Sequence, residues 1–181
     1  GRPLRYLRRS GFQGRVYPIN PNRATVQGER SWPSLADLPE VPEHVFVLSP
    51  TDSVLSTASE CARLGVRVIT VLASGFSEAG EEGLARERQL RDICAATGLR
   101  LLGPSSLGVV NPGNGLMLTA NAAFAEPDLP VGEVLVASHS GSMIGALVSR
   151  GKARGVGFAG LAPLVLHTVA PGARRGRCWR W

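Results

Sequence analysis

Cysteine is scarce in this sequence. Only Cys61, Cys94 and Cys178 occur among 181 residues, no two of them form a CxxC pair, and no histidine lies at ligand spacing from them. Zinc sites and disulfide frameworks need such pairs, and no carboxylate pair stands out at a strand end. We therefore expect no metal site, and we interpret the first two cysteines as small core residues on helices.

Long apolar runs are absent as well. No stretch approaches the roughly 18 apolar residues that span a bilayer, and Gly1 is followed by the charged Arg2 rather than by the apolar core of a signal peptide. With 44% apolar residues, the chain can still bury a substantial core. These features predict a cytoplasmic globular protein with no membrane partner.

Positive charge is concentrated at one end of the chain. The formal net charge is +6, but four arginines lie in the last eight residues, so the preceding body is close to neutral. A nucleic-acid-binding domain carries a basic patch on its folded part. The other basic cluster, Arg2, Arg5, Arg8 and Arg9, has helical spacing and is interpreted as a solvated helix face, so we expect no nucleic-acid partner.

Apolar runs alternate with amphipathic segments through the first hundred residues. Continuous apolar runs are typical of parallel strands covered on both faces, and apolar residues at three- and four-residue spacing predict helices between them. This rhythm predicts an α/β fold with a doubly wound parallel sheet. Strands are expected at Arg15–Asn20, Val45–Leu48, Val66–Leu72 and Leu99–Leu102, and helices at Pro3–Ser10, Val54–Leu64 and Glu78–Thr97.

The second half of the chain has less pattern. Residues 111–130 show no clear periodicity and are expected to form a linking segment. A strand at Gly132–Ala137 and a helix at Met143–Lys152 follow, and Gly155–Gly160 resembles the entry to another strand. A second α/β domain is therefore expected to start here.

Three predicted strand ends carry hydroxyl groups or free backbone amides. Open α/β sheets bind ligands at the carboxyl ends of their strands, and such loops fit a nucleotide-bearing ligand. The same residues also suit well-capped loops that bind nothing, and their spacing does not separate the two interpretations. The three loops are Ser49-Pro50-Thr51, Ser74-Gly75-Phe76 and Pro104-Ser105-Ser106.

A fourth polar turn, Ser138-His139-Ser140-Gly141-Ser142, lies between a predicted strand and a predicted helix. Its amides and hydroxyls would face a phosphate together with the helix dipole. The nucleophile turn of a serine hydrolase needs glycine two residues before the nucleophile, where this chain has Ser138. We interpret the turn as phosphate-facing and His139 as structural.

Four motifs, in this order and spacing, resemble the NDP-forming acyl-CoA synthetases. That family includes the ADP-forming acetate-CoA ligases and is related to the succinyl-CoA synthetase alpha subunit. The resemblance implies a Rossmann-like CoA-binding domain over residues 1–100, a connecting segment over 101–130 and the start of a succinyl-CoA-synthetase-like flavodoxin domain over 131–160. The motifs are Val16-Tyr17-Pro18-Ile19-Asn20-Pro21-Asn22, Trp32-Pro33-Ser34-Leu35, Gly103-Pro104-Ser105-Ser106-Leu107-Gly108 and Val136-Ala137-Ser138-His139-Ser140-Gly141-Ser142.

The resemblance also implies a ligand and a reaction. Coenzyme A would lie across Asn20-Pro21-Asn22-Arg23, Ser49-Pro50 and Ser74-Gly75, with Pro104-Ser105-Ser106 near its thiol end. The turn of Ser138, Ser140, Gly141 and Ser142 would face the phosphate of a catalytic histidine. The family reaction converts acyl-CoA, ADP and phosphate reversibly into acid, CoA and ATP through that phosphohistidine, with Mg²⁺ and an ATP-grasp domain or beta subunit.

The chain departs from the family pattern in several places. The family's first strand and its glycine-rich turn would precede Gly1, and its catalytic histidine would lie beyond the last residue, so the chain alone is expected to be inactive as a ligase. Ser105 stands where Asn is usual, Ser106 where Cys or Thr is frequent, and His139 where Gln or Arg is more usual. Residues 161–181 lose all periodicity, which we interpret as a reading-frame change or a premature end. An uninterrupted frame through codon 160 in related genes would contradict this interpretation.

Other functions stay open at the level of sequence. A non-catalytic CoA-sensing module of a protein acetyltransferase would carry the same motifs, and an acetyltransferase domain in the parent gene would favour it. An NAD(H)-binding domain would have an acidic residue after its second strand, where Asn20-Pro21-Asn22-Arg23 instead suits a phosphorylated ribose. A basic tail that binds nucleic acid or membrane is the alternative to a frame change.

Overall fold

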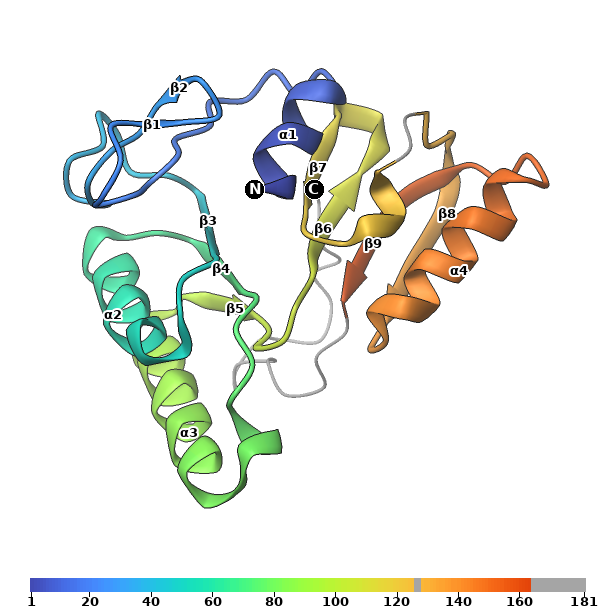
Figure 1. The fold of residues 1–181 in the computed structure, drawn as a ribbon. Coiled ribbons are helices and arrows are strands. Elements are labelled where there is room, and N and C mark those ends of the chain that lie inside the picture. The colour runs from blue at the N-terminus through green and yellow to red at the C-terminus, as the bar shows by residue number, and fades with distance from the viewer. Residues whose placement is uncertain (126–127, 164–181) are drawn as a thin grey trace. The chain divides into compact units, whose positions relative to one another are not determined.

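The chain divides into two compact units. The computed structural model describes residues 1–125 and 128–163, and Figure 1 shows their elements. In this part of the chain, the first unit contains residues 1–41 and 107–163, and the second contains residues 42–106. The expected tail lies outside the described residues from position 164 onward, and Cys178 lies there too.

The second unit contains a parallel sheet whose central strand is mostly buried. The register pairs Val45 with Ile69 and Ile69 with Leu101. Ile69 is fully buried and Leu101 nearly so, whereas most residues of the edge strands are half-buried or exposed. The strands are β3 (His44–Val47), β4 (Val68–Val71) and β5 (Arg100–Leu102), in the order β3-β4-β5.

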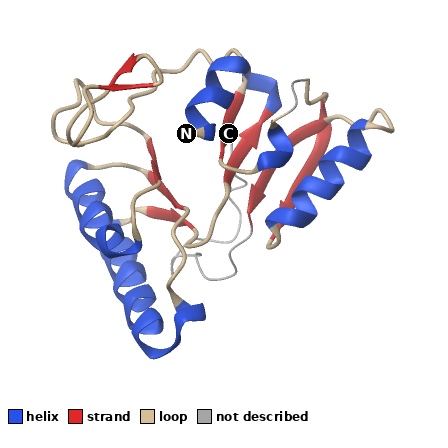
Figure 2. Ribbon diagram, viewed as in Figure 1, coloured by secondary structure: helices blue, strands red, loops and turns tan. Residues whose placement is uncertain are grey.

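Two helices pack side by side in this unit, α2 (Val54–Leu64) and α3 (Gly80–Thr97), as Figures 1 and 2 show. Short 3-10 turns precede them at Thr51–Ser53 (η1) and Ser77–Ala79 (η2). Both helices end at a glycine with positive φ, Gly65 at 82° and Gly98 at 75°, where a side chain would be strained. Each crossover thus returns to the amino end of the next strand. The predicted α/β fold class, a Rossmann-like arrangement with parallel strands, is confirmed.

The first unit contains a mixed sheet with a core of its own. Strands β8 and β9 are parallel and joined by helix α4 (Gly141–Lys152), whereas β6 runs antiparallel to both of its neighbours. The strands are β6 (Gly108–Asn111), β7 (Leu116–Thr119), β8 (Val131–Ser138) and β9 (Phe158–Pro163), in the order β7-β6-β9-β8. The core side chains are Tyr6, Val110, Phe124, Ile144, Val148, Phe158 and Leu161.

Helix α1 (Arg2–Arg9) uses its arginines to contact the rest of the first unit. Arg8 pairs with Glu29 at 2.6 Å, in the short antiparallel ribbon of β1 (Thr25–Val26) and β2 (Glu29–Arg30). Arg2 donates to the Ala120 carbonyl, and Arg9 donates to the Phe124 carbonyl. The predicted solvated face is therefore also an anchoring face for this helix.

Three predicted elements differ from the structure. The strand expected at Arg15–Asn20 is reduced to a single parallel bridge between Ile19 and Trp32, because Pro18 lacks the amide that a ladder needs. The expected linking segment over residues 111–130 contains β7, whose hairpin with β6 closes at Gly115 with φ of 73°. Helix α4 begins two residues earlier than predicted, because the Ser140 hydroxyl caps it by accepting from the Met143 amide.

The two described cysteines are inert core residues. Cys61 and Cys94 are buried, and burial raises the pKa of the Cys61 thiol to about 12 and that of Cys94 to about 11. Both thiols therefore stay protonated near neutral pH. Among the described residues, no group of three or more His, Cys, Asp or Glu side chains could hold a metal ion. None of the helices described has the length and apolar character of a membrane span.

Candidate functional site

Three polar loops lie at one edge of the parallel sheet. They comprise residues 48–53, 72–79 and 103–106, and each follows the carboxyl end of β3, β4 or β5. Because these strands are parallel and adjacent, their carboxyl ends share one edge, the usual place for ligands in open α/β sheets. The second unit therefore places the three polar loops noted in the sequence beside one another.

The first two loops are joined by a direct hydrogen bond. The Thr51 hydroxyl donates to the Ser74 carbonyl at 2.7 Å. The Ser53 hydroxyl lies 2.8 Å from both the Ser49 hydroxyl and the Pro50 carbonyl. The hydroxyls at this strand end thus satisfy backbone groups and fix the loop before α2 begins.

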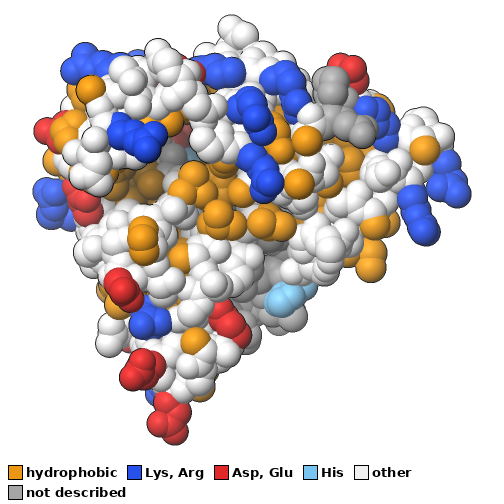
Figure 3. Space-filling model, viewed as in Figure 1, with side chains coloured by type: hydrophobic (Ala, Val, Ile, Leu, Met, Phe, Trp, Pro, Cys, Tyr) orange, Lys and Arg blue, Asp and Glu red, His pale blue; other side chains and the backbone are white. Residues whose placement is uncertain are grey.

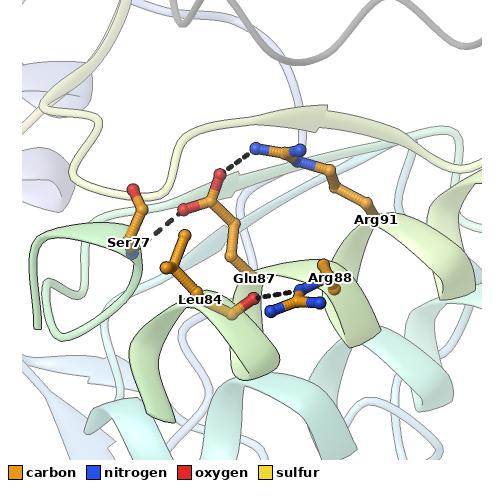
Figure 4. A network of polar contacts seen from close by, with 5 residues as sticks. All are labelled: Ser77, Leu84, Glu87, Arg88 and Arg91. Atoms are coloured by element: carbon orange, nitrogen blue, oxygen red, sulfur yellow. Dashed lines mark hydrogen bonds and ion pairs between the residues drawn. The ribbon is translucent and has the colours of Figure 1, made fainter. Parts of the chain in front are cut away.

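Side chains from η2 and helix α3 hold the loop after β4. The Gly75 amide donates to the Glu78 carboxylate at 2.6 Å, and Arg86 donates to the Gly75 carbonyl. The Ser77 amide donates to Glu87 at 3.0 Å, as Figure 4 shows. Burial acts to raise the pKa of Glu78, but amide hydrogen bonds outweigh it and hold that pKa below its ordinary value.

The loop after β5 is bonded to the end of β4. The Ser105 amide donates to the Ala73 carbonyl and the Ser106 amide to the Val71 carbonyl, both at 3.0 Å. A Cβ at Gly103 would lie 2.5 Å from the Val71 carbonyl oxygen, so only glycine permits this approach. The Gly103–Pro104 peptide is cis, and Ser105 has a φ of 58°.

The residues of these loops differ in exposure and in the chemical groups that they carry. Amides, hydroxyls and carboxylates occur in the three loops, but histidine, cysteine and lysine do not. The loops can therefore bind a polar ligand, and they lack a group that titrates near pH 7. Pro50, Ser74 and Ser105 are exposed, Ser49, Gly75 and Pro104 are half-buried, and Ser106 is fully buried.

The turn predicted at Asn20-Pro21-Asn22-Arg23 lies in the first unit. The Asn20 side chain accepts from the Asn22 amide at 2.9 Å, which closes an Asx turn. The Arg23 side chain is exposed. On the face shown in Figure 3, Lys and Arg side chains gather over α1 and the β1–β2 ribbon, whereas Asp and Glu gather near η2 and the start of α3.

The turn predicted at Ser138–Ser142 also lies in the first unit, at the amino end of α4. The Ser138 hydroxyl accepts from the Ser140 amide at 3.1 Å, and the Ser140 and Ser142 hydroxyls lie 2.9 Å apart. Asn121, which lies just after β7, donates a hydrogen bond from its side-chain amide to the Gly141 carbonyl at 2.9 Å and so holds the turn. The hydroxyls therefore cap the helix and shape its first turn.

Sequence reasoning missed the residues that hold the central loop. Arg86 and Glu87 lie in the helix predicted over residues 78–97, among its other charged residues, and nothing in the spacing distinguishes them from Glu81 or Glu82. Glu87 is only 4% exposed, but its position four residues before Arg91 is matched by Glu82 before Arg86, so this spacing does not identify it. Whether one carboxylate of a charged run is buried depends on tertiary packing, which the local sequence does not show.

A cavity of about 230 Å³ lies at the opposite edge of the same sheet. Its lining includes Gly65 and Gly98, which end α2 and α3, and helix C-termini carry partial negative charge. Of its two arginines, Arg67 is paired with Glu43 at 3.4 Å. The candidate site is placed at the carboxyl edge instead, because ligands of open α/β sheets bind outside the carboxyl ends of the strands.

Comparison with known proteins supplies independent evidence. Residues 1–112 match the family described as CoA binding domain. The acetate–CoA ligase (ADP-forming) II of Archaeoglobus fulgidus is 32% identical over 143 residues, which cover 78% of this chain and 21% of that protein. The alpha subunit of acetate–CoA ligase (ADP-forming) II from Pyrococcus furiosus is 31% identical over 145 residues, which cover 80% of this chain and 31% of that subunit.

A solved structure agrees with these sequence relatives. The dinucleotide-forming acetyl-coenzyme A synthetase 1 of Ca. Korarchaeum cryptofilum, in complex with phosphate and ADP, matches with a TM-score of 0.82 and 29% identity. The match covers 93% of this chain and 35% of that one. The chain spans about a fifth of the length of the ligase from Archaeoglobus fulgidus.

Proposed function

The chain belongs to the CoA-binding domain family, and from this we propose that it binds coenzyme A as part of an ADP-forming acyl-CoA synthetase. The observation that carries the proposal is the match over residues 1–112 together with the shared edge of the three loops. The sequence relatives are ADP-forming ligases, which supports the acyl-CoA synthetase context.

The proposed contacts in the second unit come from exposed and half-buried groups. Ser49-Pro50, Ser74-Gly75 and Pro104-Ser105 offer hydroxyls and backbone groups to the amides and hydroxyls of coenzyme A. Ser106 is fully buried, so in this proposal it supports the loop through its amide. The donor set fits a neutral, hydrogen-bonding portion of the ligand, because these loops carry carboxylates rather than cations.

Two further contacts are proposed in the first unit. Asn20-Pro21-Asn22-Arg23 combines an Asx turn with an exposed arginine, which suits a phosphorylated ribose. The turn of Ser138, Ser140, Gly141 and Ser142 opens a twelve-residue helix, whose dipole favours a phosphate. Each of these turns is proposed on its own geometry.

The complete reaction is proposed by analogy with the relatives. In it, acyl-CoA, ADP and phosphate give acid, CoA and ATP through a phosphohistidine, and this chain contributes coenzyme A binding. Nucleotide and Mg²⁺ chemistry would come from an ATP-grasp domain or a beta subunit. The existence of a relative that is itself an alpha subunit supports a partner of this kind.

Titration calorimetry of the 181-residue chain tests the binding proposal. Coenzyme A is expected to bind at one site per chain, and NADH, the control ligand, is expected not to bind. Binding of NADH in preference to coenzyme A would support a redox domain instead. Absence of heat with coenzyme A would contradict the proposal.

A further inference from the structure

One side of helix α3 is fitted closely to the loop after β4. Gly83, Arg86 and Glu87 lie three and four residues apart, so they share one side of the helix. A Cβ at Gly83 would lie only 1.7 Å from the Phe76 carbonyl oxygen. The loop and the helix therefore approach as closely as their backbones allow.

Glu87 is the buried charge in this contact. Its carboxylate accepts a hydrogen bond from the Ser77 amide at 3.0 Å and forms an ion pair with Arg91, as Figure 4 shows. Burial acts to raise the pKa of Glu87, but hydrogen bonding from Ser77 and the Arg91 guanidinium outweigh it, so the pKa lies below its ordinary value. A buried carboxylate that stays ionised needs partners in fixed positions, and one of these partners is the loop itself.

We propose that Glu87 is a positioning residue for coenzyme A, which fixes the loop on which Ser74 and Gly75 face the ligand. This inference rests on the proposed function. Glu78 and Arg86 engage the amide and carbonyl of Gly75, but Glu78 is exposed and Arg86 half-buried, whereas Glu87 is buried. A loop ordered before binding loses less entropy when the ligand arrives.

The test compares coenzyme A affinity among variants by titration calorimetry. Glu87→Ala is expected to weaken binding about tenfold, the value of one charge-assisted hydrogen bond. Glu87→Gln keeps a carbonyl oxygen for the Ser77 amide and is expected to stay within about threefold of wild type. Glu82→Ala, at an exposed position in the first turn of the same helix, is the matched control and should bind as wild type does.

Two further measurements keep the proposal testable if the Glu87→Ala variant does not fold. Gly83→Ala places a Cβ against the Phe76 carbonyl oxygen and so displaces the loop without removing a charge, and weaker binding is expected again in a variant that circular dichroism shows to be folded. In the wild-type chain, hydrogen exchange at the Ser77 amide is expected to be slow before coenzyme A is added. A rapidly exchanging Ser77 amide would overturn the proposal without any variant.

The outcomes separate this inference from the function on which it rests. If the wild-type chain does not bind coenzyme A, the proposed function fails. If wild type binds and a folded E87A variant binds equally well, Glu87 has no positioning role. If E87A and E87Q lose affinity equally, the charge rather than the held Ser77 amide matters, which also overturns the proposal.

Discussion

At the scale of single residues, burial determines how His44 responds to pH. Its Nε2 lies 2.7 Å from the hydroxyl of the fully buried Thr70, and burial lowers the pKa of His44 to about 4. The unfolded chain binds a proton at this side chain near pH 6.5, and the folded chain does so only near pH 4. The stabilisation is therefore complete above pH 6.5 and is lost as the pH falls toward 4.

We predict that the free energy of unfolding falls by up to about 3 kcal/mol between pH 6.5 and 4 through His44. Urea unfolding followed by circular dichroism at half-unit pH steps measures the slope. The window between pH 5 and 6.5 isolates His44, because the carboxylates with a lowered pKa, Glu29, Glu78 and Glu87, change protonation on unfolding only below their ordinary pKa of 4.5. A His44→Gln variant that kept the wild-type slope in this window would contradict the prediction.

Ser105 shows what a motif can indicate about backbone conformation. The family resemblance places Asn at this position, and the structure gives the residue a φ of 58°, where Asn is favoured over other residues with a Cβ. We predict that Ser105→Asn raises the free energy of unfolding by about 0.5–1 kcal/mol. Urea unfolding midpoints for S105N and S105G measure it, and an unchanged midpoint in both would show that the position is not strained.

At the scale of elements, the β6–β7 hairpin depends on a close backbone approach at Gly108. Its φ is 105°, and an added Cβ would lie 2.1 Å from the Leu118 carbonyl oxygen. We predict that Gly108→Ala lowers the free energy of unfolding by about 2–4 kcal/mol, because it adds a backbone clash to an unfavourable φ. Gly28→Ala is the control, since Gly28 has a φ of 83° with nothing within 4 Å, and it should cost about 1 kcal/mol. Equal losses in the two variants, measured by urea unfolding, would contradict the role of the close approach.

The same scale shows why some elements follow from sequence and others do not. Strands β3, β4 and β5 and helices α2 and α3 were predictable, because buried runs and helical periodicity are local signals with clear glycine ends. Strand β7 was missed because Leu116–Thr119 is short and its pairing depends on β6. The strand expected at Arg15–Asn20 does not form, because its local apolar character cannot replace the amide that Pro18 lacks.

At the scale of the whole molecule, the parallel sheet gathers separate loops into one candidate site. Sequence alone identified those loops, because hydroxyl and glycine residues at strand ends are visible in the chain and open α/β sheets bind ligands there. It could not identify Glu87, nor the burial of Ser106, because both depend on packing between segments distant in sequence. Motifs therefore located the loops, and only the fold showed what supports them.

The central claim is that coenzyme A binds at the carboxyl edge of the parallel sheet. Amide chemical shifts in an isotope-labelled chain test this claim most directly. On addition of coenzyme A, we predict the largest shifts at Ser74, Gly75 and Ser105, with little change at the opposite edge. Shifts confined to the cavity lined by Arg67 and Arg100, with the three loops unmoved, would contradict the account.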